Sequence, residues 1–125
     1  MMLRNWKSLR RKAKRGNRGY PVATVACYGP DDRRASKLVV GILAYDGDDG
    51  GPMRKWFSDA DVRADPAILA EALEFIAAND VRSVALLDRT IGCPHEEGKD
   101  YSLDEECPQC PLWHGINRWT GERIR

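Results

Sequence analysis

Residues 65–90 read DPAILAEALEFIAANDVRSVALLDRT, and they give the clearest indication of the fold class. Asp65 is a favourable N-cap, and Pro66 suits the first position of a helix. The apolar residues that follow share one helical face; they are Leu69, Ala72, Leu73 and Ile76. Asn79 tolerates the left-handed conformation that often ends a helix, so we predict a helix from Pro66 to Asn79. The continuous apolar run in residues 81–90 then predicts a strand covered on both faces.

Three more strands are predicted upstream of this helix. Residues 20–27 and 38–45 are rich in apolar and β-branched side chains, and the turn sequence Gly29-Pro30-Asp31-Asp32 lies between them. We therefore expect an antiparallel hairpin, followed by a third strand over residues 53–58. The predicted fold class is α/β (α+β): a small antiparallel or mixed sheet with one main helix, in the order strand, strand, strand, helix, strand, and a C-terminal zinc-binding tail.

Charge divides the chain unevenly. Eight of its 20 Lys and Arg residues lie among the first 20 residues, which contain no Asp or Glu, whereas all 19 acidic residues lie in the remainder. A cationic segment of this density attracts phosphate backbones. Residues 1–19 are predicted to be a basic, flexible arm, and residues 20–125 a single domain. The candidate nucleic-acid-binding residues of the arm are Arg4, Lys7, Arg10, Arg11, Lys12, Lys14, Arg15 and Arg18.

The strongest motif in the chain has the spacing C-x-H-x11-C-x2-C. It consists of Cys93, His95, Cys107 and Cys110, and each Cys has a proline beside it. A closed structural zinc site takes four Cys or His ligands at tetrahedral corners, and two short-spaced pairs can supply them. We therefore predict that one Zn²⁺ binds within a tail spanning about residues 92–114. His114 is an alternative to His95, because C-x2-C-x3-H is also a usable spacing.

Two other chemistries fit parts of this motif. His95, Glu96 and Glu97 followed by the C-x2-C pair resemble the H-x-E and C-x-x-C signature of zinc deaminases, in which a glutamate shuttles protons. Against this, Cys93 offers a fourth protein ligand, which would close the site to water. Metal binding explains the C-x-x-C pair more simply than redox chemistry does, because Cys93 and His95, which are typical metal ligands, precede the pair. Cys27, alone on the first predicted strand, is expected to be a small buried side chain.

The composition of the chain also predicts where in the cell the protein lies. No apolar region follows the basic start, so no signal peptide is predicted, and clustered Cys in a reducing compartment favours metal over disulfides. No run approaches the about 18 apolar residues that a membrane-spanning helix requires. We therefore expect a cytoplasmic protein.

Several short motifs carry a resemblance to known sequences. They are YPVAT at 20–24, YGPD at 28–31, ASK at 35–37, GCPHEEG at 92–98 and CPQCP at 107–111. With these motifs the chain resembles a family of small, uncharacterised bacterial proteins, and the resemblance covers nearly everything after residue 19. It implies a bacterial, cytoplasmic protein and no particular activity.

Three functions are compatible with these features. The first is a non-enzymatic, zinc-stabilised domain that binds nucleic acid, such as RNA in a ribonucleoprotein, through its basic arm. The second is a protein-interaction module or small assembly subunit whose arm docks on an acidic protein surface. The third is a zinc-dependent hydrolase or deaminase-like enzyme that uses Glu96 or Glu97. The sequence does not predict an oligomeric state.

Overall fold

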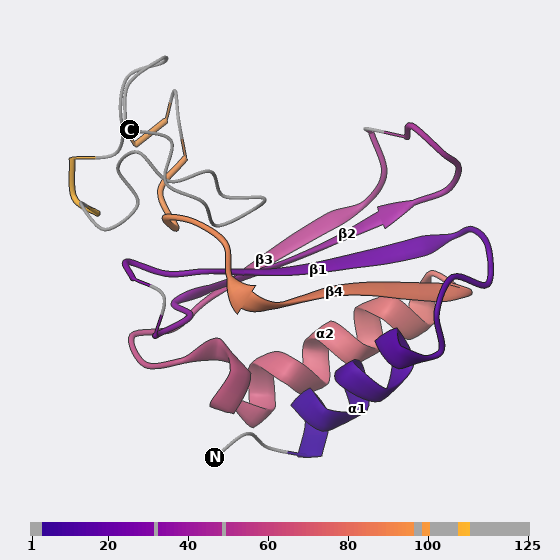
Figure 1. The fold of residues 1–125 in the computed structure, drawn as a ribbon, viewed down its shortest axis with the longest axis horizontal. Coiled ribbons are helices and arrows are strands. Elements are labelled where there is room, and N and C mark those ends of the chain that lie inside the picture. Colours follow the sequence, from indigo (N-terminus) through magenta and orange to yellow (C-terminus); the bar gives the residue numbers. More distant parts are fainter. Residues whose placement is uncertain (1–3, 32, 49, 97–98, 101–107, 111–125) are drawn as a thin grey trace.

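The computed structural model describes residues 4–31, 33–48, 50–96, 99–100 and 108–110. It confirms the predicted α/β (α+β) class and the order strand, strand, strand, helix, strand, with one more α-helix than expected, at the start of the chain (Figure 1). The elements, in order, are α1 (Arg4–Lys14), β1 (Val22–Tyr28), β2 (Lys37–Leu43), β3 (Met53–Phe57), the short 3-10 helix η1 (Val62–Ala64), α2 (Pro66–Ala78) and β4 (Ser83–Thr90).

The four strands form one mixed sheet in the order β3-β2-β1-β4. The predicted hairpin is present: β1 and β2 are antiparallel, with Val25 opposite Val40 and Cys27 opposite Leu38. β3 adds to β2 in antiparallel fashion, whereas β4 pairs with β1 in parallel, after a crossover through α2. Near the end of β4 the pairing with β1 shifts register between Ala26 and Cys27, and such an irregularity bends a strand locally.

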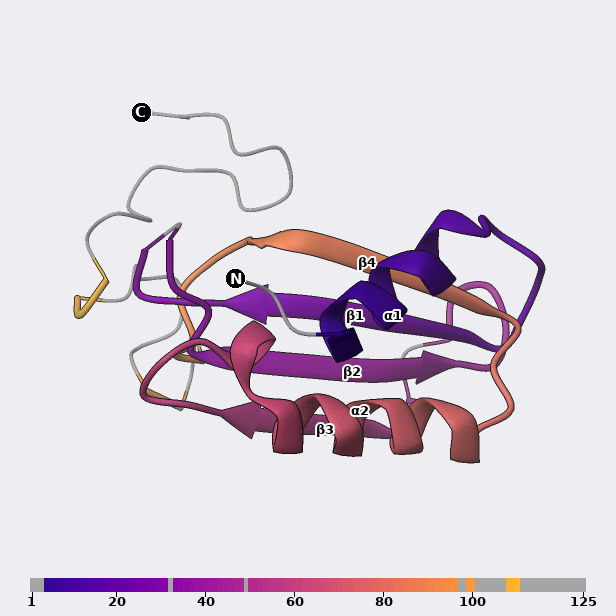
Figure 2. The same ribbon diagram turned by 90° about the horizontal axis from the view of Figure 1, so that it is seen from below.

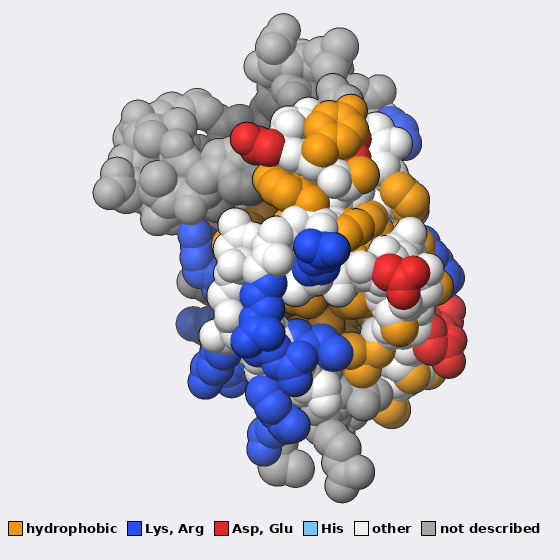
Figure 3. Space-filling model, turned by 90° about the vertical axis from the view of Figure 1, so that its right-hand side faces the viewer, with side chains coloured by type: hydrophobic (Ala, Val, Ile, Leu, Met, Phe, Trp, Pro, Cys, Tyr) orange, Lys and Arg blue, Asp and Glu red, His pale blue; other side chains and the backbone are white. Residues whose placement is uncertain are grey.

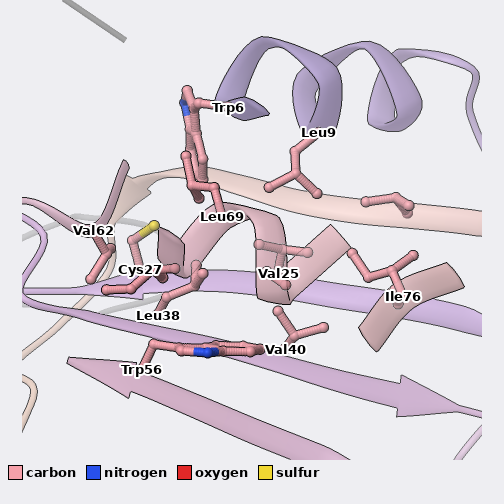
Figure 4. Close-up of a cluster of buried hydrophobic side chains, with 14 of the residues drawn as sticks. Trp6, Leu9, Val25, Cys27, Leu38, Val40, Trp56, Val62, Leu69 and Ile76 are labelled. Atoms are coloured by element: carbon pink, nitrogen blue, oxygen red, sulfur yellow. The ribbon is translucent and has the colours of Figure 1, made fainter. Parts of the chain in front are cut away.

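Both helices lie on the same side of the sheet, as Figure 2 shows. Side chains alternate along β1, so that Ala23, Val25 and Cys27 face the helices and are buried. Figure 4 shows the resulting core, in which side chains from the sheet meet those of both helices. The opposite side of the sheet carries exposed side chains such as Met53 and Phe57, and no described helix covers it.

Helix α1 differs from the flexible arm predicted for residues 1–19. Trp6 and Leu9 are fully buried, and Ala13 packs against the same core. These positions recur at helical spacing, so the charged side chains fall on the outer surface. Burying a large apolar side chain stabilises a fold by about 1.5–3 kcal/mol, which offsets repulsion among solvated cations. The segment that follows α1 is also held, because the backbone N–H of Arg18 donates to Ser83 Oγ (2.6 Å).

Helix α2 begins as its sequence predicts. The carboxylate of Asp65 accepts hydrogen bonds from the backbone N–H groups of Ala67 (3.0 Å) and Ile68 (3.1 Å), which caps the helix. The helix ends one residue earlier than predicted, and Asp80, with a φ of 50°, adopts the left-handed conformation expected of Asn79. Among the described residues, no helix is both long and apolar enough to cross a bilayer.

Candidate metal centre

The chain segment after β4 is held against the end of the sheet by backbone hydrogen bonds. The N–H of Ile91 donates to the carbonyl of Cys27 (3.0 Å), and the N–H of Gly29 donates to the carbonyl of Gly92 (2.9 Å). These bonds fix the position of Cys93, which follows directly. The first predicted metal ligand therefore lies on backbone anchored to β1, the strand that β4 pairs with.

Three of the predicted ligands lie together beyond the end of β4. The distance from His95 Nδ1 is 3.1 Å to Cys93 Sγ and 3.5 Å to Cys110 Sγ, and all three ligand atoms lie within 4.8 Å of one another. Zinc bond lengths and a tetrahedral angle give a nitrogen-to-sulfur separation of about 3.5 Å. The two observed separations are close to this value, so the cluster can hold a metal ion.

The surroundings of the two thiols suit metal binding. Cys93 and Cys110 are buried, with exposed fractions of 5% and 1%. The backbone N–H of His95 donates to Cys93 Sγ (3.2 Å), a contact of the kind that orients the sulfur ligands of metal sites. A buried thiolate needs a positive charge beside it, which a bound cation supplies.

A salt-bridge cluster fixes the metal-binding segment to the outer face of the sheet. The carboxylate of Glu96 accepts two hydrogen bonds from Lys55 Nζ (3.0 and 2.9 Å) and one from Lys37 Nζ (3.3 Å). Lys37 Nζ also donates to the carbonyl of Pro94 (3.1 Å). Lys37 lies on β2 and Lys55 on β3, so the residues on either side of His95 are tied to two strands. Glu96 thus anchors the segment that carries His95.

The same contacts define the ionisation of Glu96. Hydrogen bonds from Lys55 are the main reason that the pKa of Glu96 lies below its ordinary value; partial burial opposes this effect, and Lys37 adds to it. Glu96 is consequently a carboxylate at neutral pH. Lys37 and Lys55 were not predicted from the sequence, although a lysine at an apolar strand is a signal that its charge has a partner.

The other residues considered for the metal chemistry have different positions. Cys27 is buried in the hydrophobic core, as predicted, and does not belong to the described ligand cluster. Cys107, the fourth predicted ligand, lies outside the described residues, as do His114 and Glu97. The structure thus brings together three of the four predicted ligands.

The predicted nucleic-acid-binding residues lie in a different part of the molecule. Most of the basic side chains on and after α1 are exposed, and Lys12 is half-buried. The side chain of Arg4 lies outside the described part of the structure. Figure 1 shows α1 on one side of the sheet and the segment after β4 rising on the other side. The exposed residues of the set are Lys7, Arg10, Arg11, Lys14, Arg15 and Arg18.

Comparison of the chain with protein-family models, curated proteins and solved structures finds no match. The resemblance to small bacterial proteins therefore stays a prediction. The protein is a mixed α/β domain with a Cys-His-Cys cluster able to hold a metal ion.

Proposed function

We propose that this protein is a non-enzymatic, zinc-stabilised α/β domain that binds nucleic acid through the cationic surface of α1. The observation that carries the metal part is the convergence of Cys93, His95 and Cys110 within 4.8 Å. Two sulfur ligands and one imidazole are the donors that zinc takes in structural sites, whereas magnesium and calcium take oxygen ligands. The ion proposed for the cluster is therefore Zn²⁺.

Cys107 is the proposed fourth ligand. It precedes Cys110 by three residues, and a chain of three residues spans at most about 11 Å, so its position is restricted by its neighbour. C-x-x-C pairs of this kind are common in tetrahedral zinc sites. Four protein ligands leave no position for a reactive water, so the proposed role of the ion is to stabilise the tail and hold it against the sheet.

The environment of Glu96 supports a non-enzymatic role. A proton shuttle works best when its pKa lies near the working pH, and it must reach the reacting group. The carboxylate of Glu96 has a lowered pKa and is engaged by Lys37 and Lys55. Both properties favour an anchoring role over acid-base chemistry.

The proposal of nucleic-acid binding rests on the packing of α1 against the core. Because Trp6 and Leu9 are buried in the core, the helix presents its basic side chains in a fixed arrangement on the surface. α1 contains no acidic residue to neutralise them. Figure 3 shows Lys and Arg side chains gathered on the end of the molecule where α1 ends. Such a surface contacts phosphates, which gives affinity without base recognition.

Removing three charges from α1 is the direct test of nucleic-acid binding. In the triple variant K7Q/R11Q/K14Q, we expect weaker binding to single- and double-stranded oligonucleotides of several sequences. The slope of log affinity against log salt concentration should become shallower by about 2–3, because each lost phosphate contact removes about 0.7–0.9 from it. Fluorescence anisotropy at several salt concentrations measures both quantities.

A matched variant separates local contacts from net charge. R33Q/R34Q/R54Q removes the same charge from exposed residues that lie outside α1, and we expect it to change the slope much less. Equal effects of the two variants, or wild-type protein that binds no oligonucleotide at about 50 mM salt, would contradict the proposal. The second outcome would direct attention to an acidic protein surface as the partner of α1.

A further inference from the structure

A groove lies between α1 and α2 on the helical side of the molecule. Its volume is about 260 Å³, and its lining comes from the end of α1 and the residue after it, from the last turns of α2, and from the start of β4 with the chain that leads into it. It is separate from the metal centre and shares no residue with it. Pockets for drug-sized ligands have volumes of about 300–1,000 Å³, so this groove suits a smaller molecule.

The floor of the groove is aliphatic. Ile76 and Val84 are buried, and Leu73 and Val81 are half-buried beside them. No serine, threonine, asparagine, glutamine or aromatic side chain of the described residues contributes to the lining. The floor therefore offers no hydrogen bonds for the edge of a nucleobase and no ring for stacking. It is suited to an aliphatic chain.

The rim of the groove is cationic. Lys12, Arg15 and Arg82 line it, against a single acidic residue, Asp80, among those described. Within the described chain, none of these four side chains takes part in an ion pair. Basic side chains at the C-terminal end of a helix interact favourably with the helix dipole. This interaction explains the presence of Lys12 and Arg15 at the end of α1. Arg82 belongs to neither helix, so the dipole does not explain its position. The arrangement leaves an excess of positive charge over an aliphatic floor.

We propose that this groove binds a small amphiphilic anion, with its carboxylate or phosphate head at Lys12, Arg15 and Arg82 and its aliphatic body on the floor. The charged rim attracts and selects an anionic head, and contact between the aliphatic part and the floor adds affinity by removing apolar surface from water. This site shares Lys12 and Arg15 with the predicted nucleic-acid-binding residues, but its ligand and its lining on α2 are different, and it rests on neither proposed function. Figure 3 shows basic and hydrophobic side chains next to each other on this end of the molecule.

Short-chain ligands test the proposal with full-length protein. Octanoate carries the anionic head and the chain, octanol the chain alone, and acetate the head alone; octyl phosphate replaces the carboxylate with a phosphate. Titrations of ¹⁵N-labelled protein should give saturable amide shifts around the groove with octanoate or octyl phosphate, and whichever binds more tightly identifies the head group. We expect octanol to bind at least tenfold more weakly and acetate not to saturate. Equal binding of octanoate and octanol, or no saturable shifts with either anion, would overturn the proposal.

Two substitutions on α2 provide a matched pair. Ala77 is exposed and lines the groove, so A77L should fill it and weaken octanoate binding at least tenfold. Ala70 is also exposed on the same helix but lies outside the groove, so A70L should leave binding unchanged. Unchanged binding in A77L, with an unaltered melting temperature, would refute the site. The variant K7Q/R11Q/K14Q keeps the three basic residues of the rim. The nucleic-acid experiment and the octanoate experiment can therefore fail independently of each other.

Discussion

Replacing Cys110 with serine is expected to lower zinc affinity by at least about 100-fold. Structural zinc sites bind with apparent free energies of about 10–16 kcal/mol, so one ligand of four accounts for several kcal/mol. The effect should be large because Cys110 is buried and lies 3.5 Å from His95 Nδ1, where a serine hydroxyl is a poor substitute for a thiolate. Competition with a chromophoric chelator measures the change in affinity.

Cys27 provides the matched control for this experiment. It is a buried cysteine of the core and does not belong to the ligand cluster, so C27A should bind zinc as tightly as the wild-type protein does. C27A should still reduce stability, since it removes a buried side-chain atom. Wild-type affinity in C110S would mean that Cys110 is not a ligand.

Replacing Trp6 with alanine is expected to lower the free energy of unfolding by about 3–5 kcal/mol, the range for large aromatic residues truncated in cores. Trp6 is fully buried and joins α1 to the core that lies between the helices and the sheet (Figure 4). Natural domains have only about 5–15 kcal/mol of stability, so this loss would remove much of it. Urea denaturation followed by circular dichroism measures the change.

Two variants on the same helix show whether packing is the cause. K7A alters an exposed neighbour and should shift stability by less than about 0.5 kcal/mol. W6F should cost less than W6A because it keeps an aromatic ring; it also removes an indole N–H that has no hydrogen-bond partner within the described structure. A change below about 1 kcal/mol in W6A would show that α1 does not contribute to the core in solution.

Much of the domain follows from local sequence patterns. Helix α2 was predictable because the Asp65 cap, the proline after it and the apolar face all indicate the same element. The hairpin of β1 and β2 was predictable for the same reason, since two apolar runs flank a turn sequence. The metal cluster was predictable because Cys and His residues at such short spacings are typical of metal ligands.

Features that depend on tertiary contacts were not predictable. The charge of α1 suggested a flexible arm, and only the sheet, built from distant residues, supplies the surface that buries Trp6 and Leu9. The link from Glu96 to Lys37 and Lys55 joins residues at least 41 positions apart, which sequence spacing cannot reveal. The groove between α1 and α2 likewise exists only because the two helices lie side by side on one face of the sheet.

The most direct test of the metal centre is the zinc content of full-length protein purified without a metal-affinity tag. Elemental analysis should find one zinc ion per chain in wild-type protein, retained after extensive dialysis against metal-free buffer. A well-folded protein with no zinc, or with zinc lost on dialysis alone, would contradict the proposal that Cys93, His95 and Cys110 belong to a structural zinc site.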